Sequence, residues 1–258
     1  MTTRQQQLTN FLRTWSRTWL TIDLEMHSLL GIKRLGGFLS HRKQCFIRNL
    51  LGKLKLSFID LLEQKKDHID AFLVRKLWPI LDFDFDFVPS TGASGGLLLI
   101  WNSARLNNIS VMKGDRWICL EFFFNSHYIQ HILIYASNLA SKISSLWAVL
   151  LPLTCFSDMV FITGEFNKIL TSKERLNCVG FSASMLALQN FLNESKLIDL
   201  PLQGHTFTWR NSYSKSRIDR IFAFILAANT WSSLSLFALP NRYFDHAPLL
   251  LQSDLKIE

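Results

Sequence analysis

Acidic, amide and histidine side chains lie at the ends of several predicted strands, where catalytic groups are often found. Glu165 and Asn167 come directly after a buried apolar run. Asp219 lies in a late strand, and Asp245 and His246 come just before the last one. Carboxylates hold Mg²⁺ and prepare a water molecule, an amide orients a phosphate oxygen, and a histidine paired with an acid stabilises developing charge. This set of groups indicates metal-assisted hydrolysis of a phosphoester.

Two regular patterns predict the elements that position these groups. Helical spacing of apolar residues occurs over 42–56, 67–78, 140–154 and 185–192, and Pro152 is expected to end or kink the third helix. Apolar or alternating runs predict strands at 57–62, 82–88, 97–101, 109–112, 117–124, 130–136, 159–163, 197–199, 206–209, 217–223 and 248–252. The four runs between residues 97 and 136 are expected to form one meander. Hairpin-linked strands interleaved with helices predict an α/β sandwich built on largely antiparallel sheets.

The composition excludes several classes of protein. With 258 residues, 48% hydrophobic residues, 11 Gly and 6 Pro, the chain is neither disordered as a whole nor collagen-like. Its longest apolar runs fall far below the ~18 residues of a membrane-spanning helix, so we expect no membrane association. Four cysteines without a Cys-x-x-Cys pair favour reduced thiols, and the N-terminal segment lacks the apolar block of a secretory signal. These features predict an intracellular protein.

The net charge of +8 lies entirely in the first third of the chain. Residues 1–80 contain 14 Lys and Arg against 6 Asp and Glu, whereas residues 81–258 contain 14 of each kind. A basic segment attracts polyanions, and contacts with phosphates give an affinity that falls as salt is added. The charge pattern indicates DNA as a salt-dependent partner bound through residues 1–80, with a solvated helix face as the alternative. No protein partner is evident from the sequence.

Several short motifs occur in an order that is similar to a known family. They are GGLLLIWN at 95–102, IYAS at 134–137, GEFN at 164–167, LIDLPLQG at 197–204, TFTW at 206–209, SRIDR at 216–220 and DHAP at 245–248. Together they resemble the endonuclease/exonuclease/phosphatase domain of plant LINE-type non-LTR retrotransposons. The resemblance covers residues 30–258 and leaves residues 1–29 as an unmatched N-terminal extension. No Asp-Asp pair of a polymerase palm occurs, so we expect a copy without the reverse transcriptase.

The resemblance implies a fold, an activity and a set of site residues. It implies a DNase I-like, four-layer α/β/β/α sandwich of two mixed, largely antiparallel sheets, with the active centre at one end. The implied activity is Mg²⁺-dependent hydrolysis that nicks DNA to prime reverse transcription, and a functional protein would act in the nucleus. By the same resemblance, Tyr135 contacts the phosphate, Asn167 positions it, and Asp245 lies beside the metal. His246 would stabilise the transition state, with Asp219 behind it.

Three positions depart from the family pattern, and two of them touch the metal or its water. Glu165 replaces the family's water-activating Asp, so its carboxylate is longer by one methylene, about 1.5 Å. When residues 63–66 are aligned with the family's Gln-Glu-Thr-Lys, neutral Gln64 replaces the metal-binding Glu, and Glu63 points to the other face of the strand. Gly31 replaces a phosphate-orienting Asn. The resemblance implies that the metal lies at positions Gln64, Glu165 and Asp245. Because two of these three positions are altered, we expect weakened Mg²⁺ binding and much slower hydrolysis.

Other functions remain open from the sequence. A working Mg²⁺ endonuclease, a phosphatase-type protein acting on a small phosphorylated molecule, and a scaffold are all compatible with the implied fold. An impaired domain that keeps the fold is the hypothesis that the substitutions favour. Convergence of Gln64, Glu165, Asp245 and His246 on one pocket would indicate an inherited and damaged site.

Overall fold

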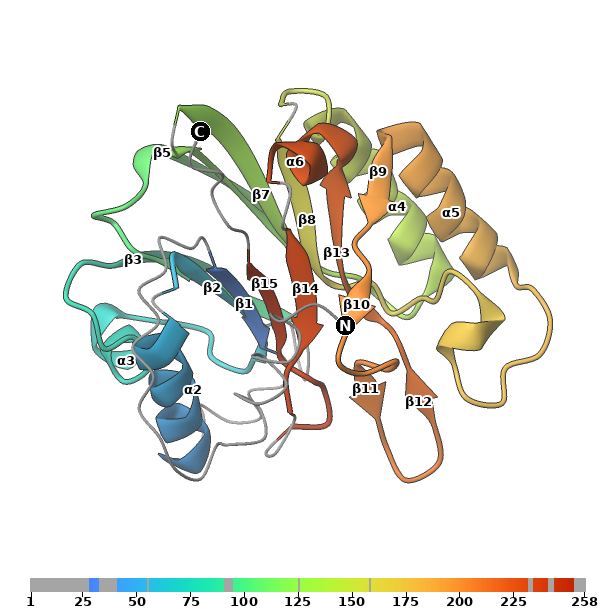
Figure 1. Ribbon diagram of the computed structural model, residues 1–258, viewed down its shortest axis with the longest axis horizontal. Coiled ribbons are helices and arrows are strands. Elements are labelled where there is room, and N and C mark those ends of the chain that lie inside the picture. Colours follow the sequence, from blue (N-terminus) through green and yellow to red (C-terminus); the bar gives the residue numbers. More distant parts are fainter. Residues whose placement is uncertain are drawn as a thin grey trace, which may run out of the picture.

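Two β-sheets form the centre of the computed structural model, which describes residues 28–32 by their backbone and residues 41–54, 56–90, 95–124, 126–157, 159–231, 234–240 and 244–252 (Figure 1). The first sheet contains, in spatial order, β10 (Leu202–Gln203), β14 (Ser235–Ala238), β15 (Leu249–Gln252), β1 (Ser28–Ile32), β2 (Phe58–Gln64), β4 (Gly96–Trp101) and β3 (Asp84–Val88). The second contains β5 (Asn107–Gly114), β6 (Trp117–Phe124), β7 (His127–Tyr135), β8 (Val160–Glu165), β13 (Asp219–Phe224) and β9 (Leu197–Asp199). A short hairpin of β11 (Trp209–Arg210) and β12 (Lys215–Ser216) stands apart from both sheets.

Both sheets are mixed, and helices cover their outer faces. The pairs β1–β2, β10–β14 and β7–β8 run parallel, whereas the other neighbouring strands run antiparallel. The helices are α2 (His41–Leu54), α3 (Ala71–Arg75), α4 (Ala140–Leu153), α5 (Ala183–Ser195) and α6 (Ile225–Thr230), with a 3₁₀ turn η1 (Ser172–Glu174). In Figure 1, α2 and α3 lie beside the first sheet, and α4 and α5 lie beside the second.

Apolar side chains fill the three spaces between these layers. Leu99 of β4 and Leu133 of β7 are fully buried in the core between the two sheets. Ile47 of α2 packs in a second core on the outer side of the first sheet. Trp147 of α4 and Phe191 of α5 stack with ring centroids 4.5 Å apart in a third core on the outer side of the second sheet. This arrangement confirms the predicted four-layer α/β/β/α sandwich.

The strand predicted at 97–101 forms, but the prediction that it begins a single meander through residue 136 is wrong. This strand, β4, lies in the first sheet between β2 and β3. The meander consists of β5, β6 and β7 in the second sheet. All six residues of β4 are buried. A fully apolar run is typical of a strand covered on both faces, and its periodicity does not say which sheet it joins.

The helix predicted over 67–78 forms only as the shorter α3. The side chain of Asp70 accepts a hydrogen bond from the Leu73 backbone N–H at 2.8 Å, which marks the N-cap and the start of the helix. Pro79 disfavours helical backbone at the residue before it, so the pattern cannot extend further. The other predicted helices form as α2, α4 and α5, and α4 ends at Leu153, directly after Pro152, as expected.

Strand β1 forms the centre of the first sheet and begins two residues before the predicted domain start at residue 30. It pairs with β15 on one side and with β2 on the other. Gly31 lies opposite Leu249 of β15 and Asp60 of β2. The rest of the predicted extension, and the basic residues Lys33 and Arg34, lie outside the described residues. Among the helices that the structure describes, none combines the length and apolarity needed to cross a membrane.

A polar cluster crosses the interior between the two sheets. Asp60 of β2 is 1% exposed and accepts a hydrogen bond from Thr163 Oγ1 of β8 at 2.6 Å. The Nε2 atom of His131 in β7, a fully buried residue, lies 3.0 and 3.1 Å from the two carboxylate oxygens of Asp60. The His131 Nδ1 atom has no hydrogen-bond partner among the described residues. The imidazole therefore uses Nε2–H to satisfy the buried carboxylate of Asp60.

Candidate active site

Three neighbouring strands of the second sheet bring three candidate residues into one row. Tyr135 at the end of β7 pairs with Glu165 at the end of β8, and Glu165 pairs with Asp219 at the start of β13. Residues directly opposite in a sheet carry their side chains on the same face. All three residues are buried, and Glu165 is only 2% exposed. The strand order therefore gathers a phenol and two carboxyl groups from distant parts of the sequence.

Gly164 allows β7 and β8 to meet closely beside this row. Its φ of +130° lies in a region that L side chains rarely adopt, and a Cβ at this position would overlap the carbonyl oxygen of Ile134. Glycine adopts this conformation without steric cost because it has no Cβ. The glycine of the GEFN motif thus has a structural role next to the candidate acid.

Asp219 and His246 form a close, buried pair. The Oδ2 atom of Asp219 lies 2.7 Å from the Nδ1 atom of His246, whose exposed fraction is 2%. A carboxylate on Nδ1 holds an imidazole in one orientation and one tautomer, and it stabilises the imidazolium form when a proton arrives. The pair therefore has the geometry of an acid-oriented histidine, with Nε2 left for another partner.

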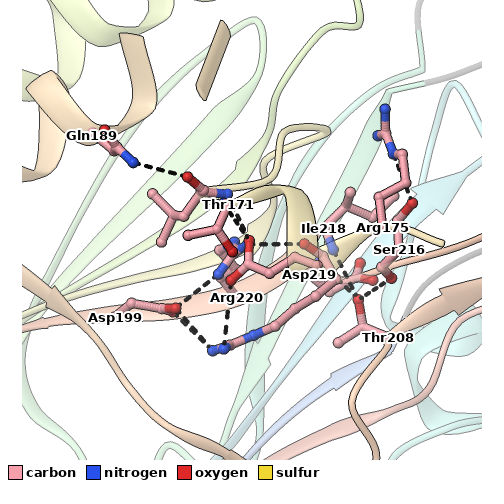
Figure 2. Close-up of polar contacts among 12 residues, drawn as sticks. Thr171, Arg175, Gln189, Asp199, Thr208, Ser216, Ile218, Asp219 and Arg220 are labelled. Carbon is pink, nitrogen blue, oxygen red and sulfur yellow. Dashed lines mark hydrogen bonds and ion pairs between the residues drawn. The ribbon is translucent and has the colours of Figure 1, made fainter. Parts of the chain in front are cut away.

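One short segment next to β11 holds both members of this pair. The Thr208 Oγ1 atom accepts a hydrogen bond from the Asp219 backbone N–H at 3.0 Å (Figure 2), and the Thr208 carbonyl accepts one from Ala247 N–H at 2.7 Å. The next residues continue this contact, since Arg210 N–H donates to the Asp245 carbonyl at 3.0 Å. The TFTW motif therefore joins β13 to the loop that carries Asp245 and His246.

Asn167 lies in the loop that follows β8. Its φ is +54°, and its Nδ2 atom donates to the Ala136 carbonyl at 2.7 Å. Because Ala136 follows Tyr135 in the chain, this bond places the Asn167 amide beside the end of β7. The Ala136 N–H in turn donates to the Glu165 carbonyl at 2.8 Å. The side chains of Tyr135, Glu165 and Asn167 thus share one end of the sandwich with the Asp219–His246 pair.

Glu63, and not Gln64, is the residue of β2 whose side chain reaches this end of the sandwich. The Tyr135 hydroxyl donates a hydrogen bond to Glu63 Oε1 at 2.8 Å. The expectation that Glu63 points to the opposite face is wrong, because the pairing of β2 with β4 shifts between Leu62 and Gln64. Glu63 is the residue in this β-bulge and has a φ of +56°. A bulge interrupts the alternation of a strand and re-aims a side chain.

Gln64, which was expected at the metal position, has a structural role instead. It is 1% exposed, and its Nε2 atom donates to the Val88 carbonyl of β3 at 3.1 Å. Its Oε1 atom accepts from the Lys66 N–H at 2.7 Å. The side chain lies against Gly96 of β4, where a Cβ would come within 2.6 Å of Gln64 Nε2. Both ends of the Gln64 amide are therefore used, one by β3 of the first sheet and the other by the backbone directly after β2.

Arg116 is a cation beside the site for which the sequence contains no motif. It lies between β5 and β6, and its guanidinium carbon is 5.7 Å from the centre of the Tyr135 ring. Its backbone carbonyl accepts a hydrogen bond from Tyr135 N–H at 3.0 Å. A half-buried guanidinium next to a phenol offers donors that suit a phosphate. No signal in the sequence pointed to this residue, because single arginines in turns are common.

The acids at this end fit a Mg²⁺ ion only together with a substrate. Within the described residues, no group of three or more His, Cys, Asp or Glu side chains is close enough to hold a metal ion. Asp219 is bound to His246, whereas half-buried Glu63 and Asp245 lie at the same end of the sandwich. Mg²⁺ in proteins is often bound by one or two carboxylates and completes its shell with water and substrate phosphate oxygens. The donor chemistry of Glu63 suits such a shared site.

The fold is the DNase I-like fold of endonuclease/exonuclease/phosphatase proteins, which confirms the predicted fold class. The endonuclease domain of TRAS1, a telomere-specific non-LTR retrotransposon, superimposes with a TM-score of 0.67 at 12% identity over 90% of this chain and 99% of that domain. The AP endonuclease LMAP from Leishmania major gives 0.71 at 12% identity over 89% and 88%. The 3′ phosphatase NExo from Neisseria, bound to product DNA, gives 0.64 at 15% identity over 88% and 99%.

No family model matches the sequence, and no curated protein matches it. The similarity to the solved structures lies between 12% and 15% identity, so it establishes the fold and not an activity. Any function must therefore be argued from the residues of this chain.

Proposed function

We propose that this chain is a DNA phosphodiesterase domain of the endonuclease/exonuclease/phosphatase type whose catalytic rate is reduced by its own substitutions. The observation that carries the proposal is the Asp219–His246 pair at 2.7 Å, located at the same end of the sandwich as Tyr135 and Glu63. An acid-oriented histidine near a carboxylate and a phenol suits attack of water on a phosphodiester. The three structural neighbours are named as an endonuclease, an AP endonuclease and a 3′ phosphatase, which supports nucleic acid as the substrate.

Each side chain would have a separate task in this reaction. Arg116 would bind a non-bridging phosphate oxygen, and Tyr135 would donate its single hydroxyl proton to another one in place of Glu63. Asn167 would orient the phosphate from the other side. His246, oriented by Asp219, would stabilise the negative charge that develops on the phosphate. Glu165 would accept the proton of the attacking water. The burial of Glu165 and His246 removes competing water, so these electrostatic effects would be stronger than in bulk solvent.

Mg²⁺ would be held by Glu63, with Asp245 close by in the same loop as His246. When bound, the ion would supply positive charge that neutralises the phosphate oxygens and would lower the pKa of a water molecule. With Glu63 as the metal ligand, the replacement of the family's Glu by Gln64 would not weaken metal binding, and the bulge at Glu63 supports this assignment. The proposed impairment therefore rests on Glu165 and Gly31, with Glu165 as the larger effect because it acts on the attacking water.

DNA is the proposed partner, and basic groups near the site support this choice. Lys65 and Lys66 are exposed and directly follow β2, which ends at Gln64 next to Glu63. Contacts of this kind release counterions, so the affinity for DNA would fall as salt is added.

Substitutions at Glu63 and Gln64 test the metal assignment. We expect Glu63→Gln to raise the Mg²⁺ concentration for half-maximal nicking of supercoiled plasmid by about tenfold or more, because the carboxylate ligand is lost. We expect Gln64→Glu to leave this Mg²⁺ concentration unchanged and to lower the melting temperature, because it buries a carboxylate that faces the Val88 carbonyl. Higher activity in Gln64→Glu, or an unchanged Mg²⁺ requirement in Glu63→Gln, would show that the assignment is wrong.

A further inference from the structure

Two arginines and two acids form a charged network next to the candidate site. Arg220 is fully buried, and its guanidinium donates to Asp199 Oδ2 at 2.8 Å (Figure 2) and to Glu174 Oε2. Arg217 donates to Asp199 Oδ1 at 3.0 Å and to the Leu200 carbonyl at 2.9 Å. Because Arg220 follows Asp219 in β13, its side chain lies on the other face of the strand from the Asp219–His246 pair.

The two positive charges of Arg217 and Arg220 are balanced by the two carboxylates of Asp199 and Glu174. The stability of each buried charge depends on the presence of its partners. A buried ion is stable only when its partners offset the loss of water, and the two acids provide this for both arginines. Burial raises the pKa of Asp199, and the nearby Arg220 and Arg217 oppose this shift. Burial also lowers the pKa of Arg217, while Asp199 raises it. Removal of one member therefore leaves the opposite charge poorly compensated.

Backbone hydrogen bonds close the loop that carries Asn167, next to this network. This loop, residues 166–174, leaves β8 with Phe166 N–H donating to the Ile218 carbonyl at 2.9 Å. It returns to the same strand region where Arg217 N–H donates to the Glu174 carbonyl at 2.8 Å. Its two ends are thus attached to neighbouring residues, Ile218 and Arg217, which directly precede Asp219.

The Glu174 carboxylate also organises the interior of the loop. Its Oε2 atom accepts hydrogen bonds from Leu170 N–H at 2.6 Å and Thr171 N–H at 3.3 Å, besides the one from Arg220. Gln189 of α5 donates to the Leu170 carbonyl at 2.9 Å (Figure 2). One carboxylate therefore links the turn of the loop, the buried arginine and, through Leu170, the helix layer.

We propose that Glu174 and Arg220 are positioning residues that hold the Asn167 loop at a defined distance from Asp219 and His246. The proposal rests on the proposed phosphodiesterase function. Neither residue is among the groups assigned above to the phosphate or to Mg²⁺. Their effect is to place the Asn167 amide and the oriented histidine on the same phosphate. A displacement of about 1 Å in such a group lowers a rate by on the order of a hundredfold, so loosening the loop acts on catalysis more than on binding.

The test compares Glu174→Gln with Glu194→Gln, the same change at an exposed position of α5, both in a Glu165→Asp background. The amide of Glu174→Gln keeps the size and an acceptor oxygen but removes the charge that pairs with Arg220. We expect kcat for plasmid nicking to fall about 10- to 100-fold, with KM changed by less than about threefold. The Glu194→Gln control should match its parent in both constants.

Hydrogen exchange provides a readout that does not depend on activity. In Glu174→Gln, backbone amides of residues 166–175 should exchange faster, while those of α4 should exchange as in the parent. Unchanged exchange in the loop, equal acceleration in α4, or a loosened loop with unchanged kcat would each overturn the proposal. A parent that does not nick DNA would instead reject the proposed function, and the positioning role with it, whatever the exchange shows.

Discussion

Replacing Glu165 by Asp is expected to raise the rate of Mg²⁺-dependent DNA nicking by about a hundredfold. Glu165 is buried in one row with Tyr135 and Asp219, so its carboxylate cannot withdraw to compensate for the extra methylene. The shorter side chain moves the proton-accepting oxygen by about 1.5 Å, and misplacement of this size costs on the order of two powers of ten in rate. The effect should appear in kcat, because the acid acts on water and not on the binding of DNA.

The measurement is the initial rate at which supercoiled plasmid is converted to the nicked form. Glu194→Asp makes the same change at an exposed position of α5 and serves as the control, which should nick at the rate of the unmodified protein. Equal rates for Glu165→Asp and the unmodified protein would show that Glu165 is not the cause of impairment. A high rate in the unmodified protein would show that no impairment exists.

Replacing Asp60 by Ala is expected to lower the free energy of unfolding by about 3–5 kcal/mol. The change removes the carboxylate that satisfies fully buried His131 and the hydroxyl of Thr163, and it leaves both without a partner between the sheets. For a domain of this size the melting temperature should fall by roughly 10 °C. Asp67→Ala, at an exposed position outside this cluster, should change the stability by less than about 0.5 kcal/mol.

A triple variant tests whether the loss of stability in Asp60→Ala comes from the unpaired polar groups that it leaves behind or from the loss of the Asp60 carboxylate itself. Asp60→Leu together with His131→Leu and Thr163→Val removes every polar member of the cluster. It should recover most of the stability lost in Asp60→Ala, because apolar groups of similar volume replace a buried polar cluster at little or no cost. Urea unfolding of the variants gives the comparison. A triple variant that is less stable than Asp60→Ala would contradict this explanation.

The fold could be predicted because it depends on patterns that recur along the chain. Alternating and apolar runs predicted most strands of both sheets, and the resemblance to a known family implied the four-layer arrangement, which the structure confirms. The sheet to which β4 belongs could not be predicted, because a strand that is buried on both faces has no polar side to orient it. The helix predicted over 67–78 is too long at both ends. The helical spacing of apolar residues begins before the N-cap at Asp70 and continues after Arg75, the last residue of α3.

The candidate site was harder to predict from the sequence than the fold, because two of its features depend on how the strands pair. The bulge that turns Glu63 toward Tyr135 is a shift in the pairing of β2 with β4. No local pattern in the sequence marks this shift. The row of Tyr135, Glu165 and Asp219 likewise depends on the order of three strands. Arg116 could not be found, since its place beside Tyr135 follows from the meander and not from a motif.

Plasmid nicking by Glu165→Asp and by Glu165→Asp combined with His246→Ala tests most directly whether these groups form one hydrolytic site. The account predicts Mg²⁺-dependent nicking in the first variant and its loss, by about a hundredfold or more, when the imidazole next to Asp219 is removed. Nicking that persists at an equal rate without His246 would contradict it, as would the absence of any nicking in both variants at high protein and Mg²⁺ concentrations.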